Sequence, residues 1–271
     1  WYTEKGSQIR QKYGLSGISK PDLTNLFFVQ IDEFYPIDPA HHNSFHNYVS
    51  KYYIKGFDLK KENCLLINTD EIILHENKPW KEVFPDYKID LTLRLREANS
   101  YTEEVQQKSI FKIDNWCSEY EKKIRDLGGI GFFLGGIGPD GHIAFNTRGS
   151  DHYSTTRLTY TNFETQAVAA GDLGGIEVSR NRLVITIGLE TITYNPEAVS
   201  IIFAAGEAKA DIVKASIESS PDVIYPATVL QRQRNSRFYL TQGAASKLED
   251  SLIHYYKSGK WTHEKTERAI I

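Results

Sequence analysis

The sequence predicts an α/β protein with a doubly wound, mostly parallel sheet and helices on both faces, a Rossmann-like fold. Short apolar runs alternate along the chain with longer amphipathic segments, and strands that alternate with helices form parallel sheets covered on both sides. The 271 residues are 40% hydrophobic and 25% charged, which suits one sizeable core. We find no internal repeat and no linker, and we expect a single domain over residues 1–271.

The predicted strands are short apolar runs bounded by polar or glycine-containing turns. They cover residues 26–31, 64–68, 130–134, 183–187, 199–204 and 237–240. The first run is expected to stop at the charged pair Asp32-Glu33, and Pro36 and Pro39 then break regular structure.

The predicted helices cover residues 3–13, 43–53, 102–127, 207–216 and 244–256. The second helix begins with Asn43 or Ser44 as its cap. The third is the longest, with apolar residues three to four positions apart, and the pair Gly128-Gly129 ends it. Residues 75–100 show no clear periodicity, so we predict a loop there, with a lid as one alternative.

Charge and cysteine content exclude several classes of protein. The formal net charge is -3, which argues against a nucleic-acid or anionic-membrane binder that relies on bulk electrostatics. No window approaches 18 consecutive apolar residues, and no secretory segment is recognisable. Cys64 and Cys117 form no motif, so we expect a reducing compartment, the cytoplasm. His41, His42 and His46 are closely spaced, but no additional ligand stands at an obvious spacing from them, and we expect no metal.

Three segments place reactive side chains where strands are expected to end, which is where open parallel sheets bind ligands. Asp32-Glu33 follows the first strand, residues 135–142 follow the third, and residues 205–209 follow the fifth. Each of the three segments also has a simpler, purely structural interpretation. Asp32 and Glu33 are also ordinary turn or cap residues, the glycines could form only a tight turn, and Lys209 could be a surface lysine.

The glycine-rich loop does not match a nucleotide-binding loop. Pro139 lies inside the turn, Asp140 has the wrong charge for a pyrophosphate, and the Gly-Lys-Ser/Thr of a phosphate loop is absent. A carboxylate at Asp140 two residues before an imidazole at His142 fits proton transfer better.

The block Leu-Gly-Gly-Ile-Gly-Pro-Asp-Gly-His-Ile-Ala-Phe-Asn at residues 134–146 resembles the glucosamine-6-phosphate deaminase family. Residues 31–34, 185–188, 205–209 and 225–231 support the resemblance in the same order. The wider superfamily includes 6-phosphogluconolactonases, which share the Gly-Pro-Asp-Gly-His turn. The resemblance implies the doubly wound fold, a sugar phosphate substrate, no cofactor and conversion of glucosamine 6-phosphate to fructose 6-phosphate and ammonia. The resemblance is compatible with a protein that forms a homo-oligomer.

The resemblance also implies roles for individual residues. His142 would shuttle the proton that opens the sugar ring, with Asp140 orienting it, and Asp32 would be the base at C2. Glu33 would orient Asp32 or only cap a turn, and Lys209 would bind the phosphate. The resemblance further assigns Gly135, Gly136, Gly138 and Gly141 to substrate binding.

The sequence departs from the family pattern at several positions. Thr147 stands where the family has a glutamate that supports the histidine, and Thr159 stands where allosteric members have a lysine. Residues 169–175 lack the arginine with which the family binds the substrate phosphate, and Arg180 or Arg182 is the candidate replacement. The family's phosphate turn and the natural N-terminal segment are expected before Trp1. These departures keep a catalytically weakened sugar-phosphate-binding protein as an alternative, and the shared Gly-Pro-Asp-Gly-His turn keeps a sugar lactone hydrolase as another.

Overall fold

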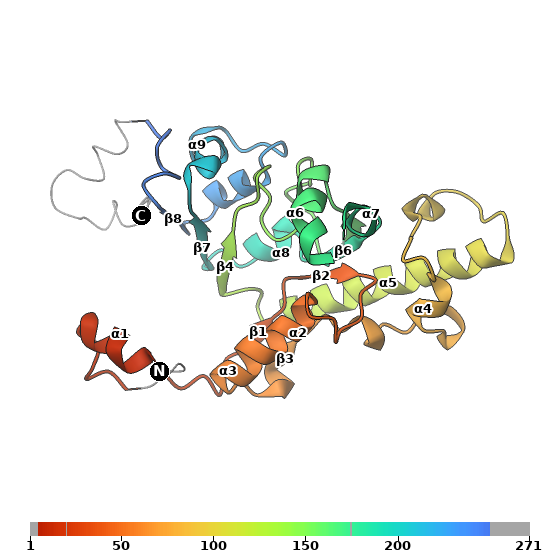
Figure 1. The fold of residues 1–271 in the computed structure, drawn as a ribbon, viewed down its shortest axis with the longest axis horizontal. Coiled ribbons are helices and arrows are strands. Elements are labelled where there is room, and N and C mark those ends of the chain that lie inside the picture. Colours follow the sequence, from red (N-terminus) through yellow and green to blue (C-terminus); the bar gives the residue numbers. More distant parts are fainter. Residues whose placement is uncertain (1–4, 20, 174, 250–271) are drawn as a thin grey trace.

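The computed structural model describes residues 5–19, 21–173 and 175–249, and it shows an α/β fold (Figure 1). The strands are β1 (Phe28–Val29), β2 (Asp32–Tyr35), β3 (Cys64–Leu65), β4 (Phe132–Gly136), β5 (Arg157–Tyr160), β6 (Leu183–Thr186), β7 (Val199–Ala204) and β8 (Asn235–Leu240). Strands β4-β7-β8 form a parallel sheet, β1 and β3 pair in parallel, and β2-β6-β5 form an antiparallel sheet. The predicted α/β class is therefore confirmed, with one antiparallel sheet that the sequence did not indicate.

The helices are α1 (Gly6–Lys12), α2 (Phe45–Val49), α3 (Lys55–Phe57), α4 (Trp80–Val83), α5 (Tyr101–Asp126), α6 (Phe163–Leu173), α7 (Ile176–Arg180), α8 (Leu189–Thr193) and α9 (Ala210–Glu218). Helix α5 is the long helix predicted from the apolar spacing. Ser100 caps its first turn, and Gly128 and Gly129 follow its end with φ angles of 88° and 83°. Ser44 caps α2, as predicted, and a π-helical turn at Ser50–Ile54 links α2 to α3.

Two apolar clusters sandwich the antiparallel sheet. Ile185 of β6 belongs to the main core with Ile113 and Ile124 of α5. Val184, on the other face of the same strand, packs in a smaller cluster with Phe34 of β2, Phe145, and Ala169 and Leu173 of α6. Helices α5 and α6 therefore cover opposite faces of this sheet (Figure 1).

The predicted strand at residues 26–31 is wrong in its bounds. The structure has β1 at Phe28–Val29 and then a separate strand that begins at Asp32, where the prediction ended one. The side chain of Gln30 fills the break, because its Oε1 accepts from the Ile67 amide at 3.0 Å and its Nε2 donates to the Asp32 carbonyl at 2.9 Å. The backbone at the break stays paired as well, because the Gln30 amide donates to the Leu65 carbonyl and the Ile31 carbonyl accepts from the Ile187 amide, both at 2.9 Å.

The predicted loop at residues 75–100 is instead packed into the core. It contains α4 and a 3₁₀ turn at Leu91–Arg94, and Trp80, Phe84 and Leu93 are buried in the main cluster. This burial does not fit the lid alternative.

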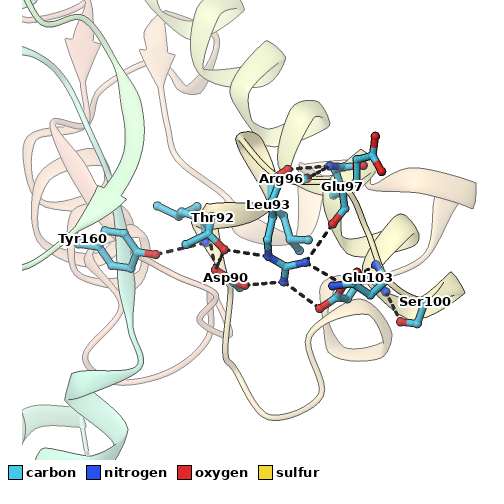
Figure 2. A network of polar contacts seen from close by, with 11 residues as sticks. Asp90, Thr92, Leu93, Arg96, Glu97, Ser100, Glu103 and Tyr160 are labelled. Carbon is cyan, nitrogen blue, oxygen red and sulfur yellow. Dashed lines mark hydrogen bonds and ion pairs between the residues drawn. The ribbon is translucent and has the colours of Figure 1, made fainter.

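Polar contacts also hold the end of this segment in place (Figure 2). Arg96 donates to Asp90 at 2.8 Å and to both oxygens of Glu103 at 2.8 and 2.9 Å, and these hydrogen bonds lower the pKa of Glu103 to about 2. The amide of Leu91 donates to the hydroxyl of Tyr160 in β5 at 3.2 Å. The network therefore ties the start of α5 to the antiparallel sheet.

The bounds of the remaining elements agree only partly with the sequence prediction. Strand β7 has the predicted bounds of 199–204, and α1 is shorter than the predicted 3–13, of which 3–4 lie outside the described residues. Residues 244–249 form turns rather than the start of a helix, although Ala244 and Leu248 are buried, and 250–256 lie outside the described residues. None of the helices within the described ranges is long and apolar enough to cross a membrane.

Candidate active site

A cavity of about 690 Å³ lies where the glycine-rich loop, α2, α6 and the turn after β7 meet. Its lining combines aromatic and small side chains with a few polar groups, a composition typical of small-molecule sites. The lining residues are Phe34, His42, Asn43, Ser44, Phe45, Tyr48, Gly138, Pro139, His142, Phe145, Thr165, Ala169, Ala208 and Lys209. The structure thus brings together three of the residues expected in the site, namely Gly138, His142 and Lys209.

His142 and Asp140 form a hydrogen-bonded pair at the wall of the cavity. The Nδ1 atom of His142 lies 2.5 Å from Oδ1 of Asp140, whose side chain is almost fully buried. Burial opposes ionisation of Asp140, but hydrogen bonds from His142 and from the Arg148 amide outweigh it and lower its pKa to about 2. An ionised carboxylate can only accept, so Nδ1 carries the proton and Nε2 of a neutral imidazole is left to exchange protons with a ligand.

Of the glycines in residues 135–141, only Gly138 lines the cavity, and it makes room for the His142–Asp140 pair. A Cβ on Gly138 would lie 2.0 Å from the ring of His142, so only glycine lets the imidazole rest there. Gly141 has a φ of 86°, and its carbonyl accepts from the Ala227 amide at 2.9 Å. Gly135 and Gly136 end strand β4. Gly135, Gly136 and Gly141 are not lining residues, and their substrate-binding role stays a prediction.

Lys209 reaches the cavity from the 3₁₀ turn Glu207–Lys209 after β7. Its ammonium donates to the Ile137 carbonyl at 2.8 Å, which anchors it beside the glycine loop. Burial lowers the pKa of Lys209, and the charge of nearby Asp140 opposes this effect. The lysine therefore presents a partly desolvated cation to the cavity, which suits an anionic ligand.

Asp32 lies on the cavity side of the antiparallel sheet but is not itself a lining residue. Side chains two positions apart on a strand share a face, and Phe34 lines the cavity. Asp32 is paired with Thr186, whose hydroxyl accepts from the Phe145 amide at 3.0 Å, and the Phe145 ring stacks on His142 at 6.0 Å. Burial, and then the charge of Glu33, raise the pKa of Asp32 to about 8. No partner of its carboxylate is found among the residues that the structure describes.

Glu33 is fully buried and is not itself a lining residue of the cavity. Its carboxylate accepts from the Ser44 hydroxyl and the His46 amide at 2.7 Å each, from the Phe34 amide at 2.9 Å and from the Phe45 amide at 3.1 Å. Burial raises the pKa of Glu33, and these hydrogen bonds offset the rise only in part. The geometry favours the capping alternative, because the carboxylate fixes the start of α2 against β2.

Replacing Glu33 is expected to destabilise the protein strongly. Glu33→Ala leaves the Ser44 hydroxyl and the amides of Phe45 and His46 buried without an acceptor, which should lower the free energy of unfolding by about 3 kcal/mol. Urea unfolding followed by circular dichroism measures this, with the exposed Glu82→Ala as the matched control. A loss below about 1 kcal/mol would show that the cap contributes little.

Sequence reasoning missed the residues that α6 and α2 bring to the cavity. Thr165 and Ala169 of α6, and Phe45 and Tyr48 of α2, line it, and α6 was not predicted at all. Arg182, one proposed substitute for the phosphate arginine, is buried elsewhere, with its guanidinium over the Tyr87 ring at 4.0 Å. Among the described residues no group of three His, Cys, Asp or Glu side chains is placed to hold a metal ion.

Comparison with known proteins finds similar sequences over most of the chain. The chain is 27% identical over 242 residues to a glucosamine-6-phosphate deaminase of Borreliella afzelii, covering 89% of this chain and 75% of the relative. It is 28% identical over 218 residues to glucosamine-6-phosphate deaminase 2 of Bos taurus, covering 79% and 76%. The chain is therefore similar to glucosamine-6-phosphate deaminases over most of its length. The resemblance seen in the sequence is therefore confirmed, although no family model matches the chain.

Solved structures show that the fold is shared by deaminases and lactonases. A monomeric glucosamine-6-phosphate deaminase superposes with a TM-score of 0.61 at 21% identity, covering 88% of this chain and 79% of that one. The 6-phosphogluconolactonase from Trypanosoma cruzi superposes with a TM-score of 0.55 at 18% identity, covering 83% and 75%. Fold alone thus does not separate the two activities.

Proposed function

We propose that the protein converts an aminosugar phosphate, glucosamine 6-phosphate, to fructose 6-phosphate and ammonia without a cofactor. The observation that carries the proposal is the His142–Asp140 pair, which faces one cavity together with Lys209. The similarity to glucosamine-6-phosphate deaminases over most of the chain supports it. Release of ammonia from glucosamine 6-phosphate, measured with a coupled assay, tests it directly.

In this proposal His142 opens the sugar ring. Opening transfers a proton from the hydroxyl on C1 to the ring oxygen, and a neutral imidazole whose Nε2 accepts and then donates can carry it. Asp140 keeps the proton on Nδ1 and stabilises the imidazolium formed in transit. The product of this step is the open aldehyde, which makes the hydrogen on C2 acidic.

Asp32 then moves the hydrogen from C2 to C1. The carboxylate removes the C2 proton, and the electron pair forms a C1–C2 double bond as the C1 oxygen gains a proton. Return of the proton to C1 leaves an imine at C2. Addition of water to C2 and departure of ammonia give the ketone, fructose 6-phosphate.

A sugar-phosphate lactonase is the second candidate, because lactonases share the fold and Thr147 replaces the family's glutamate. Such an enzyme would use His142 to activate water on a lactone carbonyl and would not need Asp32. The variants Asp32→Asn and His142→Gln separate the two. Loss of ammonia release in both supports the deaminase, whereas lactone hydrolysis that survives Asp32→Asn supports the lactonase. Tight sugar-phosphate binding by the native protein without turnover of either compound would indicate the catalytically weakened binding protein.

Lys209→Ala is expected to weaken binding of the phosphorylated sugar selectively. Loss of one charge-assisted contact of about 2 kcal/mol corresponds to a rise of roughly thirtyfold in KM for glucosamine 6-phosphate. The KM for glucosamine, which has no phosphate, should change little. Lys214→Ala on α9, whose lysine pairs with Glu218, is the matched control. Equal changes for both sugars would remove Lys209 from phosphate binding.

A further inference from the structure

The first turn of α6 carries two polar groups that the mechanism above does not use. Asn162 precedes the helix, and its Oδ1 accepts from the Thr165 amide at 2.9 Å. Its Nδ2 donates to Oδ2 of Asp140 at 2.6 Å, the oxygen that does not face His142. One side chain thus caps α6 and fixes the carboxylate that orients His142.

Thr165 is the second group. Its side chain is 6% exposed and lines the cavity, and its Oγ1 is buried with no hydrogen-bond partner in the described part of the chain. A buried hydroxyl without a partner is costly, and a hydroxyl group of a bound sugar would satisfy it. Ala169, one turn further along α6, lines the same wall.

We propose that the first turn of α6 is a substrate-binding element, in which Thr165 hydrogen-bonds the sugar and Asn162 couples that turn to the Asp140–His142 pair. This assignment rests on the proposed function for the identity of the sugar. Asn162 acts here as a positioning residue. Oδ1 of Asp140 contacts His142, and Oδ2 accepts from Asn162 at 2.6 Å and from the Arg148 amide at 3.0 Å. Loss of the Asn162 donor leaves Oδ2 with the longer Arg148 bond alone and so weakens the hold on the carboxylate. A sugar seated on Thr165 therefore meets an imidazole already held in the productive orientation.

Capping and positioning by Asn162 can be separated by substitution. Serine and aspartate cap helices about as well as asparagine. Neither keeps the donor to Asp140, because serine is too short and an aspartate places a second negative charge against it. A purely structural role as the helix cap predicts that Asn162→Ser behaves as the native protein.

The positioning role predicts a fall in kcat of about tenfold for Asn162→Ser, with the urea midpoint unchanged. Asn162→Asp should lower kcat further, but its carboxylate also repels the buried Asp140 and lowers the urea midpoint, so Asn162→Ser is the variant that decides. Thr165→Val, which keeps the shape of the side chain, should raise KM about tenfold and change kcat little. Gln166→Leu is the control, since it removes only the hydrogen bond of Gln166 to the Thr161 carbonyl in the same turn.

Two measurements do not depend on turnover. The proton between Nδ1 of His142 and Asp140 should give a downfield ¹H resonance that moves in Asn162→Ser and stays in Gln166→Leu. The Kd for fructose 6-phosphate should rise in Thr165→Val. If the native protein releases no ammonia, the proposed function fails, and these two measurements still decide the inference. An unmoved resonance in Asn162→Ser together with native affinity in Thr165→Val would overturn it.

Discussion

Asp32→Asn is expected to abolish exchange of the C2 hydrogen of the sugar with solvent deuterium, while binding of the sugar phosphate stays nearly unchanged. An amide cannot take up the proton, and loss of a general base typically slows proton transfer by about 10²- to 10⁴-fold. The carboxylate has no recorded partner among the described residues and faces the same side of β2 as Phe34. The substitution therefore removes the basic group without breaking a hydrogen bond of the described residues.

The pH dependence of the C2 exchange rate provides a second test of Asp32. Burial raises the pKa of Asp32 to about 8, so below that pH only a minority of the molecules hold the basic form. The exchange rate should rise about tenfold per pH unit up to pH 7 and level off above pH 8. ¹H NMR in D₂O from pH 5.5 to 9 follows the C2 signal, with the exposed Asp86→Asn as the control. Exchange that persists in Asp32→Asn would refute the assignment.

The sequence predicted the parts of the fold whose partners are local or strongly apolar. Helix α5 was predicted within a residue because its apolar spacing and its terminal glycines all lie within the helix and directly after it. Strand β2 was missed because Asp32 and Glu33 read as turn residues. The distant β6 supplies the partner strand, and Ser44 and the first residues of α2 supply most of the donors that make a buried Glu33 tolerable.

In the candidate site, too, only residues that belong to short sequence motifs could be predicted. The Gly138–His142 loop is recognisable because its chemistry is contained in five consecutive residues, and the structure places its imidazole and Lys209 in one cavity. The contribution of α6 could not be predicted, because residues 163–173 pack through Ala169 and Leu173 onto Val184 and Phe34, residues far away in the sequence. Asn162 became relevant only when its distance to Asp140 was known.

His142→Gln is expected to lower ammonia release from glucosamine 6-phosphate by about 10²- to 10⁴-fold. Glutamine can still donate a hydrogen bond to Asp140, but it cannot gain and lose a proton near neutral pH. Thr147 cannot act as a base near neutral pH, so the proposed mechanism assigns ring opening to His142. The Kd for fructose 6-phosphate should change by less than about threefold, because the cavity keeps its shape.

The decisive comparison uses an analogue of glucosamine 6-phosphate that lacks the hydroxyl groups at C4 and C5 and so cannot close a ring. Because this analogue bypasses ring opening, His142→Gln should process it at close to the native rate, whereas Asp32→Asn should fail on both compounds. The two variants then divide the reaction into its two proton transfers. An equal loss on the cyclic and the acyclic substrate in His142→Gln would instead place the imidazole at a step after ring opening.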